Sequence, residues 1–253
     1  MPSTDPSTPL QSPIRETLPR FAIVMAALLA LAAFPQSALF TVERIDVDGA
    51  TTLTPGTVAG IAGLRRGERL FAVDSSAALE RLRADPHIKT AELRLRPPNT
   101  VSIVITERQP VVALVVGARF AFLADDLITV ALGDDAGGLP EVTDHAGGIA
   151  WARPGAPVAS EGARLAITAL PAIPPLLRGD LKGIVVAPGG DFTLVLRTGL
   201  EVRAGGSAGL AERLAQVPQI LGALHAKGLA AFSLDLRYAG SVVVRPTAGG
   251  EAR

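Results

Sequence analysis

The sequence contains no cysteine in its 253 residues, so the chain can form neither a disulfide bond nor a thiolate metal site. Large aromatic side chains are also scarce, because besides phenylalanine the chain has only one tryptophan, Trp151, and one tyrosine, Tyr238. Positive and negative side chains balance at 24 each, and no polybasic run could neutralise a phosphate backbone. These absences argue against a nucleic-acid-binding protein.

Histidines and paired carboxylates offer little metal-binding chemistry. The histidines lie far apart and form no closely spaced ligand pair: His87, His145 and His225. Asp125-Asp126 and Asp134-Asp135 are adjacent carboxylates that lack the alternating spacing of a calcium loop, so we expect solvated turns there. The sequence predicts neither a metal site nor a cofactor.

The string GGSAG at 205–209 matches the G-x-S-x-G pattern of hydrolase nucleophiles and lies between a predicted strand and a predicted helix. The only candidates for the rest of a triad downstream are Glu212 and His225, which share that helix with Ser207. Three residues of one helix cannot converge in the required relay. We therefore predict no catalytic residue and interpret Ser207 as a helix N-cap, with a secreted hydrolase as the alternative.

Residues 21–40, FAIVMAALLALAAFPQSALF, contain no charge, and about 20 residues suffice to cross the hydrocarbon core as a helix. Arg15 and Arg20 precede this run, whereas Glu43 and Arg44 follow it, so local charge favours a cytoplasmic N-terminus. The sequence predicts a single-pass transmembrane helix in the cytoplasmic (inner) membrane, with all later residues exported.

A cleaved signal peptide is the competing interpretation of the same run. Its small-x-small site would be Ala30-Leu31-Ala32, which lies inside the apolar segment, behind a long leader. Residues 1–20 are rich in Pro, Ser and Thr and are predicted to form a disordered cytoplasmic tail.

The first exported segment, 41–109, shows the order β-α-α-β-β. A half-buried strand ends at Gly49, and Thr54, Pro55 and Gly63 supply the cap, first turn and stop of a helix. Asp74 is expected to cap a second helix that ends before Pro86. Two alternating strands follow, HIKTAELRLR and TVSIVITE, joined by PPN in a hairpin-like connection.

Residues 110–247 have a mainly β pattern with two helices. The segments predicted as strands are 111–116, 118–124, 127–132, 182–188, 191–197, 200–205, 231–238 and 241–246. One helix is expected from about Ser160 to Leu170, with its continuation broken by prolines. A second begins at Ser207 and presents Leu210, Leu214, Val217, Leu221 and Leu224 on a single apolar face. Residues 248–253 are expected to fray.

The stretches IDVDGATTLT, GLRRGERLFAVD and DPHIKTAELRLRPPNTVSIVITERQPVVAL resemble a POTRA domain (polypeptide-transport-associated domain). A POTRA domain directly behind one membrane helix is similar to the FtsQ/DivIB family of bacterial cell-division proteins, and the ending LDLRYAGSVVVRP resembles theirs, with Ala239 where proline is commoner. The resemblance implies an α+β protein: a transmembrane helix, a POTRA domain and a β-rich mixed α/β second domain.

The resemblance also implies a scaffold at the division septum that regulates septal peptidoglycan synthesis and is not an enzyme. Its expected partners are FtsB/DivIC-like and FtsL-like coiled-coil membrane proteins and other divisome components. A sheet edge can accept a partner strand, and the residues expected to bind are Arg237, Tyr238, Gly240, Ser241, Val242, Val243 and Val244. Internal pairing of this last strand, and a POTRA-bearing translocation accessory, are the alternatives.

The stretch RPPNTVSIVITERQP at 96–110 ends in a charged pair, Glu107 and Arg108. Neither has a nearby histidine, serine or second carboxylate in sequence, so we expect a solvated rim at the end of a strand. In the family that the chain resembles, the motif Glu-Arg-x-Pro marks the passage from the POTRA domain to the β domain. Glu107, Arg108 and Pro110 are therefore predicted to fix the domain junction.

Overall fold

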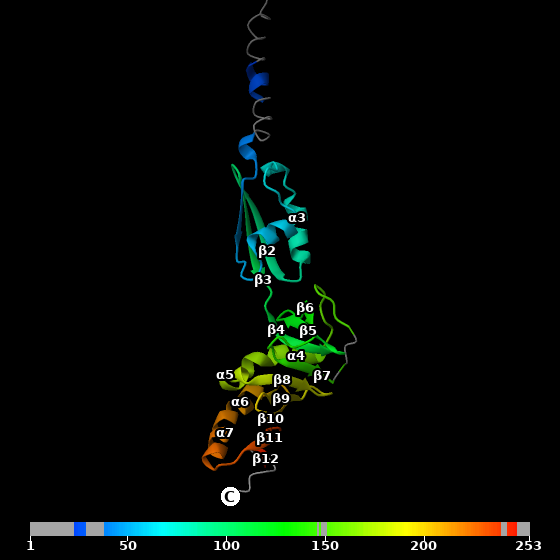
Figure 1. Cartoon of the computed structure of the whole chain (residues 1–253), viewed down its shortest axis with the longest axis vertical. Helices are drawn as coiled ribbons and strands as arrows, with labels where there is room; N and C mark the ends of the chain where they lie inside the picture. Colours follow the sequence, from blue (N-terminus) through cyan, green and yellow to red (C-terminus); the bar gives the residue numbers. More distant parts are fainter. Residues whose placement is uncertain (1–22, 29–37, 146, 148–150, 239–241, 247–253) are drawn as a thin grey trace, which may run out of the picture. The chain divides into compact units, whose positions relative to one another are not determined.

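The computed structural model describes residues 23–28, 38–145, 147, 151–238 and 242–246. The chain divides into two compact units, both of which mix helices and strands. Unit 1 comprises residues 1–82 and 91–105, and unit 2 comprises residues 83–90 and 106–253. Figure 1 shows the elements of each.

Most of the predicted membrane segment, 21–40, lies outside the described residues. Of this run, residues 23–28 are helical, and a short 3-10 helix, η2 (Ala38–Phe40), ends it. None of the helices within the described ranges is both long and apolar enough to cross a membrane. The predicted cytoplasmic tail, 1–20, is likewise outside those ranges.

The predicted β-α-α-β-β order is confirmed. The elements are β1 (Arg44–Asp48), α2 (Pro55–Ala62), η3 (Leu70–Ala72), α3 (Ser75–Ala84), β2 (Ile88–Arg96) and β3 (Thr100–Glu107). The three strands form a sheet in the order β1-β3-β2, in which β1 runs parallel to β3. The two helices cross over from β1 to the hairpin, because parallel strands cannot be joined by a tight turn.

Local capping chemistry sets the ends of the first two helices, as the sequence predicts. The Thr54 hydroxyl accepts a hydrogen bond from the Thr57 amide, and Gly63 closes α2 in the left-handed region at φ 73°. The Asp74 carboxylate accepts from the Ala77 amide at the start of α3. Gly49 also needs its glycine, because at φ 82° a Cβ would lie 2.0 Å from the Ile105 carbonyl oxygen.

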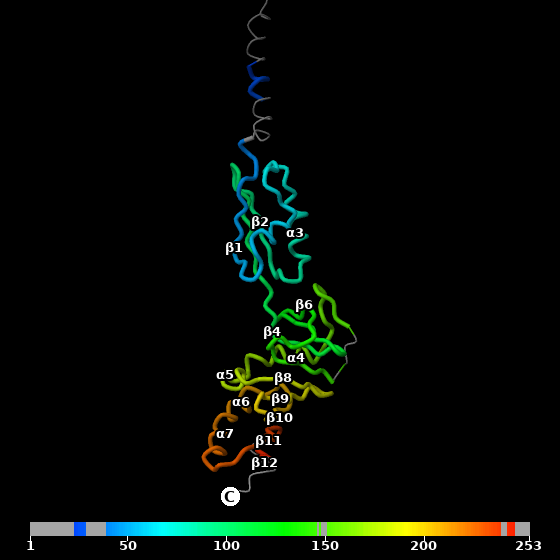
Figure 2. Tube along the Cα trace, viewed as in Figure 1, coloured from blue at the N-terminus to red at the C-terminus, as the bar shows by residue number. Residues whose placement is uncertain are grey.

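Unit 2 is built on a sheet of nine strands in the order β12-β11-β10-β9-β8-β7-β4-β5-β6. The strands are β4 (Pro110–Val116), β5 (Arg119–Ala124), β6 (Thr129–Gly133), β7 (Glu141–Asp144), β8 (Leu181–Val186), β9 (Phe192–Leu196), β10 (Glu201–Gly205), β11 (Ala231–Asp235) and β12 (Val243–Pro246). Their path through the unit can be followed in Figure 2.

The short strand β7 joins the two halves of this sheet and is parallel to both neighbours, β4 and β8. No strand was expected at residues 141–144. Four residues, EVTD, followed by a glycine-rich stretch carry too little alternation to indicate a strand. Its central residue, Val142, is nevertheless fully buried in the core.

The helices of unit 2 are α4 (Glu161–Ala169), η4 (Leu170–Ala172), α5 (Pro175–Gly179), α6 (Leu210–Ala215) and α7 (Val217–Ala226). Helix α4 lies against β7, β8 and β4, and α6 lies against β10. Between helices and sheet, alternate side chains of the strands are buried together with small residues of α4. Prominent members of this core are Leu114, Leu123, Ile184, Phe192, Leu194 and Ala166.

Two helix predictions need correction. The prolines after α4 do not simply break the chain, because Pro175 begins the further helix α5, where its missing N–H costs nothing. The single helix expected from Ser207 is in fact two, divided at Gln216, since Pro218 is at the start of α7. Its apolar face persists across the break, and Leu210, Leu214 and Val217 are buried.

Candidate functional site

Strand β12 stands at one end of the nine-stranded sheet, and among the described strands it pairs only with β11. The pairing is antiparallel and places Val244 opposite Leu234, and Val243 opposite Asp235. On the side of β12 that faces away from β11, backbone N–H and C=O groups pair with no described strand. Such an edge can accept a strand from another chain.

At the end of β11, the strand that pairs with β12, an arginine and a carboxylate form a bidentate ion pair. Arg237 donates from Nε to Asp235 Oδ1 (3.0 Å) and from Nη2 to Oδ2 (2.7 Å). The Arg237 amide donates to the same carboxylate at 3.1 Å, so the pair also shapes the turn that leaves β11. The guanidinium lies over the ring of Tyr238, 5.8 Å from its centroid.

The electrostatics of this pair favour the charged carboxylate. Hydrogen bonding from Arg237 holds the pKa of Asp235 below its ordinary value, and the charge of Arg203 acts in the same direction. Asp235 in turn raises the pKa of Arg237. Arg203 is opposite Asp235 in the parallel β10–β11 register. Two arginines and one carboxylate, Arg203, Asp235 and Arg237, therefore lie together on β10 and at the end of β11.

Of the predicted binding residues, Val243 and Val244 are in β12 and Val242 precedes it, whereas Arg237 and Tyr238 follow β11. The Arg237 side chain lies beside Gly205 of β10. Tyr238 is 59% exposed and Val243 48%, and Val242 is also exposed. Val244 packs partly against the core. Gly240 and Ser241 lie outside the described residues, so their predicted part in binding stays a prediction.

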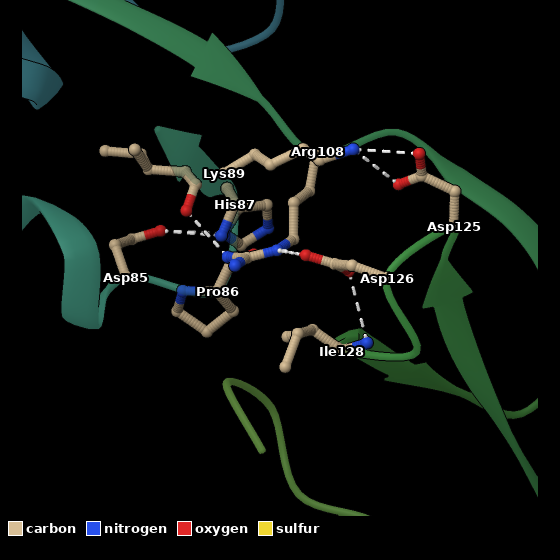
Figure 3. Close-up of polar contacts among 9 residues, drawn as sticks. Asp85, Pro86, His87, Lys89, Arg108, Asp125, Asp126 and Ile128 are labelled. Atoms are coloured by element: carbon tan, nitrogen blue, oxygen red, sulfur yellow. Dashed lines mark hydrogen bonds and ion pairs between the residues drawn. The ribbon is translucent and has the colours of Figure 1, made fainter. Parts of the chain in front are cut away.

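The predicted junction residues lie in a second polar cluster, within unit 2 (Figure 3). Arg108 donates from Nη1 to the carbonyl of Ile88 (2.6 Å) and to that of Pro86 (3.2 Å). Its Nε donates to Asp126 Oδ2 at 2.9 Å. One guanidinium thus joins the start of β2 to the turn between β5 and β6.

A second ion pair runs beside the first. Lys89 Nζ contacts both oxygens of Asp125 at 2.9 and 2.8 Å, and it lowers the pKa of that carboxyl. The Ile128 amide donates to Asp126, which closes the turn. Asp125 and Asp126 lie in a turn as predicted, and the side chain of Asp125 is 60% exposed. Each of the two carboxylates also pairs with a cation, Lys89 or Arg108.

The expected solvated rim is wrong for Arg108, whose side chain is only 12% exposed. The physical reason is that residues 83–90 and the β5–β6 turn close over it from distant parts of the sequence. Glu107 is half-buried at the end of β3. Pro110 begins β4 and pairs with Ala124, a first position where a strand tolerates proline. The assignment of these residues to a domain junction stays a prediction.

The loop that contains the GGSAG string is held by Arg213, a residue that the sequence pattern did not single out. Arg213 donates to the carbonyls of Ala204 (2.7 Å), Ala208 (2.5 Å) and Gly206. The loop therefore turns its backbone oxygens toward one cation. The predicted cap at Ser207 is wrong, because Gly209 is the N-cap of α6 and no side chain caps it.

The other candidate catalytic and metal-binding residues do not come together in the structure. His225 is at the far end of α7 from Ser207 and Glu212. His87 contacts Asp85 (3.2 Å), a local pair at the start of β2. Within the described ranges, no three His, Asp or Glu side chains gather as metal ligands would.

Comparison with known families gives two matches, which together cover most of the chain. Residues 40–108 match the family model "POTRA domain, FtsQ-type". Residues 113–237 match "Cell division protein FtsQ/DivIB, C-terminal". The first match ends at Arg108, and the second includes the paired residues Asp235 and Arg237.

Curated relatives point the same way. The chain is 29% identical over 234 residues to the cell division protein FtsQ of Anaeromyxobacter sp. (strain K), covering 85% of this chain and 77% of that one. It is 28% identical over 186 residues to FtsQ of Rhodothermus marinus, covering 73% and 68%. FtsQ of Corynebacterium glutamicum is 34% identical over 90 residues, which are 36% of this chain and 40% of the relative.

Proposed function

Because the chain belongs to the FtsQ/DivIB family of cell-division proteins, we propose that it is a divisome scaffold that acts by binding other proteins. In this role it links early and late division components and regulates septal peptidoglycan synthesis, without catalysing a reaction itself. Its partners are small coiled-coil membrane proteins of the FtsB/DivIC and FtsL types.

The observation that carries this proposal is the end position of β12 in the sheet of unit 2. A partner strand laid against β12 gains a row of backbone hydrogen bonds, which supply affinity, while flanking side chains supply specificity. Tyr238, Val242 and Val243 offer apolar surface beside that row. Arg237 is already held in place by Asp235, so it meets a partner carboxylate with little loss of side-chain freedom.

The proposed location follows from the apolar run at 21–40. As an uncleaved helix it anchors the chain in the inner membrane, with the N-terminus in the cytoplasm and both units outside it. In that topology the β12 edge is on the same side of the membrane as the exported parts of the partners. Arg108, Glu107 and Pro110 then fix the point where the POTRA domain leads into the β domain.

Two proline substitutions test the strand-addition proposal. Successive residues of a strand direct their N–H groups to opposite sides, so one of Val243 and Val244 faces β11 and the other faces outward. Val243→Pro and Val244→Pro are therefore matched variants. The variant that removes the outward N–H is expected to abolish co-purification of the organism's own FtsB-type protein, with the thermal unfolding of the chain unchanged.

The other variant, which removes the N–H that faces β11, acts as the control. It breaks a hydrogen bond to β11 and lowers the stability of the sheet edge. Co-purification of the FtsB-type protein and thermal unfolding are measured for both. Full partner capture by a folded variant that lacks the outward N–H would contradict strand addition. Capture that depends instead on the POTRA domain alone would favour a translocation accessory.

A further inference from the structure

One end of unit 1 carries exposed apolar and basic side chains together. The chain enters the unit here through η2, which Figure 1 shows beside the loop 64–72. Leu39 is 68% exposed and Phe71 51%. The ring of Phe71 packs against that of Phe40, with 5.2 Å between centroids. Two segments separated in sequence thus present one apolar surface.

The loop 64–72 is tied to the very end of the apolar run. The Val42 amide donates to the Glu68 carbonyl at 2.8 Å, and the Gly67 amide donates to the Val42 carbonyl at 2.9 Å. Thr41 and Arg69 form an isolated β-bridge. Val42 is two positions after Phe40, and two residues of chain span at most about 7 Å. The loop 64–72 therefore lies beside the end of the apolar run at Phe40.

The loop is also basic, and its cations are uncommitted. Arg65, Arg66 and Arg69 are exposed, and within the described part of the chain none of them forms an ion pair or a side-chain hydrogen bond. Further charges at this end, in segments 38–44, 64–72 and 96–100, are Arg44, Arg96, Glu43 and Glu68. Positive charge therefore predominates there, although the chain as a whole is neutral.

We propose that this patch (Leu39, Phe71, Arg65, Arg66 and Arg69) lies on the anionic lipid headgroups of the exported leaflet. The inference rests on the proposed membrane anchor at 21–40. The headgroup layer outside the hydrocarbon core is roughly 5 to 8 Å thick on each side, and the loop lies within about that distance of Phe40. Guanidinium groups bind phosphates through paired hydrogen bonds, while the apolar side chains enter the interface.

The patch would orient unit 1 against the bilayer. A single transmembrane helix leaves the attached domain free to tilt and rotate, whereas a second contact made by arginines and Phe71 restricts both. Each arginine near an anionic surface shifts the equilibrium between the docked and lifted states by about fivefold. Three arginines together shift this equilibrium by about a hundredfold.

The absence of cysteine allows a direct test on the full-length chain. Ala72→Cys, beside the patch, and Val104→Cys, as the matched control, each carry a fluorescent label on an exposed site. Val104 is opposite Asp48, at the other end of β1 from Arg44. Both proteins are reconstituted into vesicles of phosphatidylcholine with or without phosphatidylglycerol, and a headgroup spin-labelled lipid serves as quencher.

We expect strong quenching at position 72, little at position 104, and a further increase at 72 when phosphatidylglycerol is present. In Arg65→Gln/Arg66→Gln/Arg69→Gln the dependence on phosphatidylglycerol is expected to disappear. Equal quenching at both positions in vesicle-bound protein would overturn the proposal while leaving the anchor intact. Quenching at 72 that ignores phosphatidylglycerol would overturn the role of the arginines. Failure of the protein to float with the vesicles would overturn the anchor, and the patch with it.

Discussion

At the scale of single residues, Arg108 joins separate segments of unit 2 through one guanidinium. It satisfies two backbone carbonyls and a carboxylate at once, and it is largely buried. Removal of a buried charged donor leaves its acceptors without a partner, at a cost of about 1–3 kcal/mol. Arg119, by contrast, pairs with Asp134 where both side chains are exposed.

We therefore expect Arg108→Gln to lower the free energy of unfolding of unit 2 by about 1–3 kcal/mol. Arg119→Gln, the matched control, should change it by less than about 0.5 kcal/mol. Chemical denaturation followed by circular dichroism measures both. Equal effects of the two substitutions would show that the buried cluster does not stabilise unit 2.

The Asp235–Arg237 pair gives a pH dependence whose sign is fixed. The folded protein holds the pKa of Asp235 below its ordinary value, so the pair adds stability above that value. This stability is lost as the pH falls through the folded value, below about pH 4. Carboxyl ¹³C NMR titration should show the pKa of Asp235 rising in Arg237→Gln.

Arg203→Gln is the graded control for this titration. Arg203 acts on Asp235 only through its charge, whereas Arg237 also donates hydrogen bonds to it. The rise in the pKa of Asp235 should therefore be smaller in Arg203→Gln than in Arg237→Gln. A larger rise in Arg203→Gln would mean that Arg237 does not hold the carboxylate in solution.

The sequence could indicate local features of these sites but not the distant contacts that complete them. The pair Asp235 and Arg237 is two residues apart, and the resemblance to a family ending led to Arg237 directly. For Arg108, alternation along the strand correctly placed it at the end of β3, yet predicted a solvated rim. Its burial depends on Pro86, Ile88 and Asp126, and no pattern in a single sequence reports contacts between segments so far apart.

At the scale of secondary-structure elements, two serines show when a helix cap can be predicted. Ser160 caps α4: its hydroxyl accepts from the Ala163 amide (2.8 Å) and donates to Asp144 (2.7 Å). Ser207 matches a cap pattern equally well, but Gly209 at φ 65° takes that position. Arg213 holds the loop carbonyls, so the chain enters α6 two residues later than the pattern indicates.

Alanine substitution separates the two serines. Ser160→Ala should destabilise unit 2 by about 1–2 kcal/mol, because a buried cap and its bond to Asp144 are both lost. Ser207→Ala should stay within about 0.5 kcal/mol of the parent. Thermal unfolding of both variants is the measurement. A large loss of stability in Ser207→Ala would show that this hydroxyl does stabilise the start of α6.

Strands and helices were predicted correctly where the sequence pattern was long. They were missed where contacts with distant segments determine the local structure. The alternating strands from β2 to β5 and the capped helices α2 and α3 follow from local chemistry. The four-residue β7 exists because its neighbours β4 and β8 lie on both sides of it, which no local pattern reports. The break between α6 and α7 did have a local signal, Pro218, which the continuous apolar face of Leu210 to Leu224 concealed.

At the scale of the whole molecule, the chain has two units, and the surfaces proposed for binding on them are of different kinds. The edge of β12 offers backbone hydrogen bonds to a partner strand. The basic, apolar end of unit 1 offers guanidinium groups to lipid phosphates.

The central claim, that this chain is a component of the division machinery, is tested most directly by localisation. The full-length chain, with a fluorescent protein fused to its N-terminus, is imaged in dividing cells of its own organism. We predict a band at the division site that appears as constriction begins. An even halo around the membrane throughout the cell cycle would contradict the division role, whatever the folding of the two units.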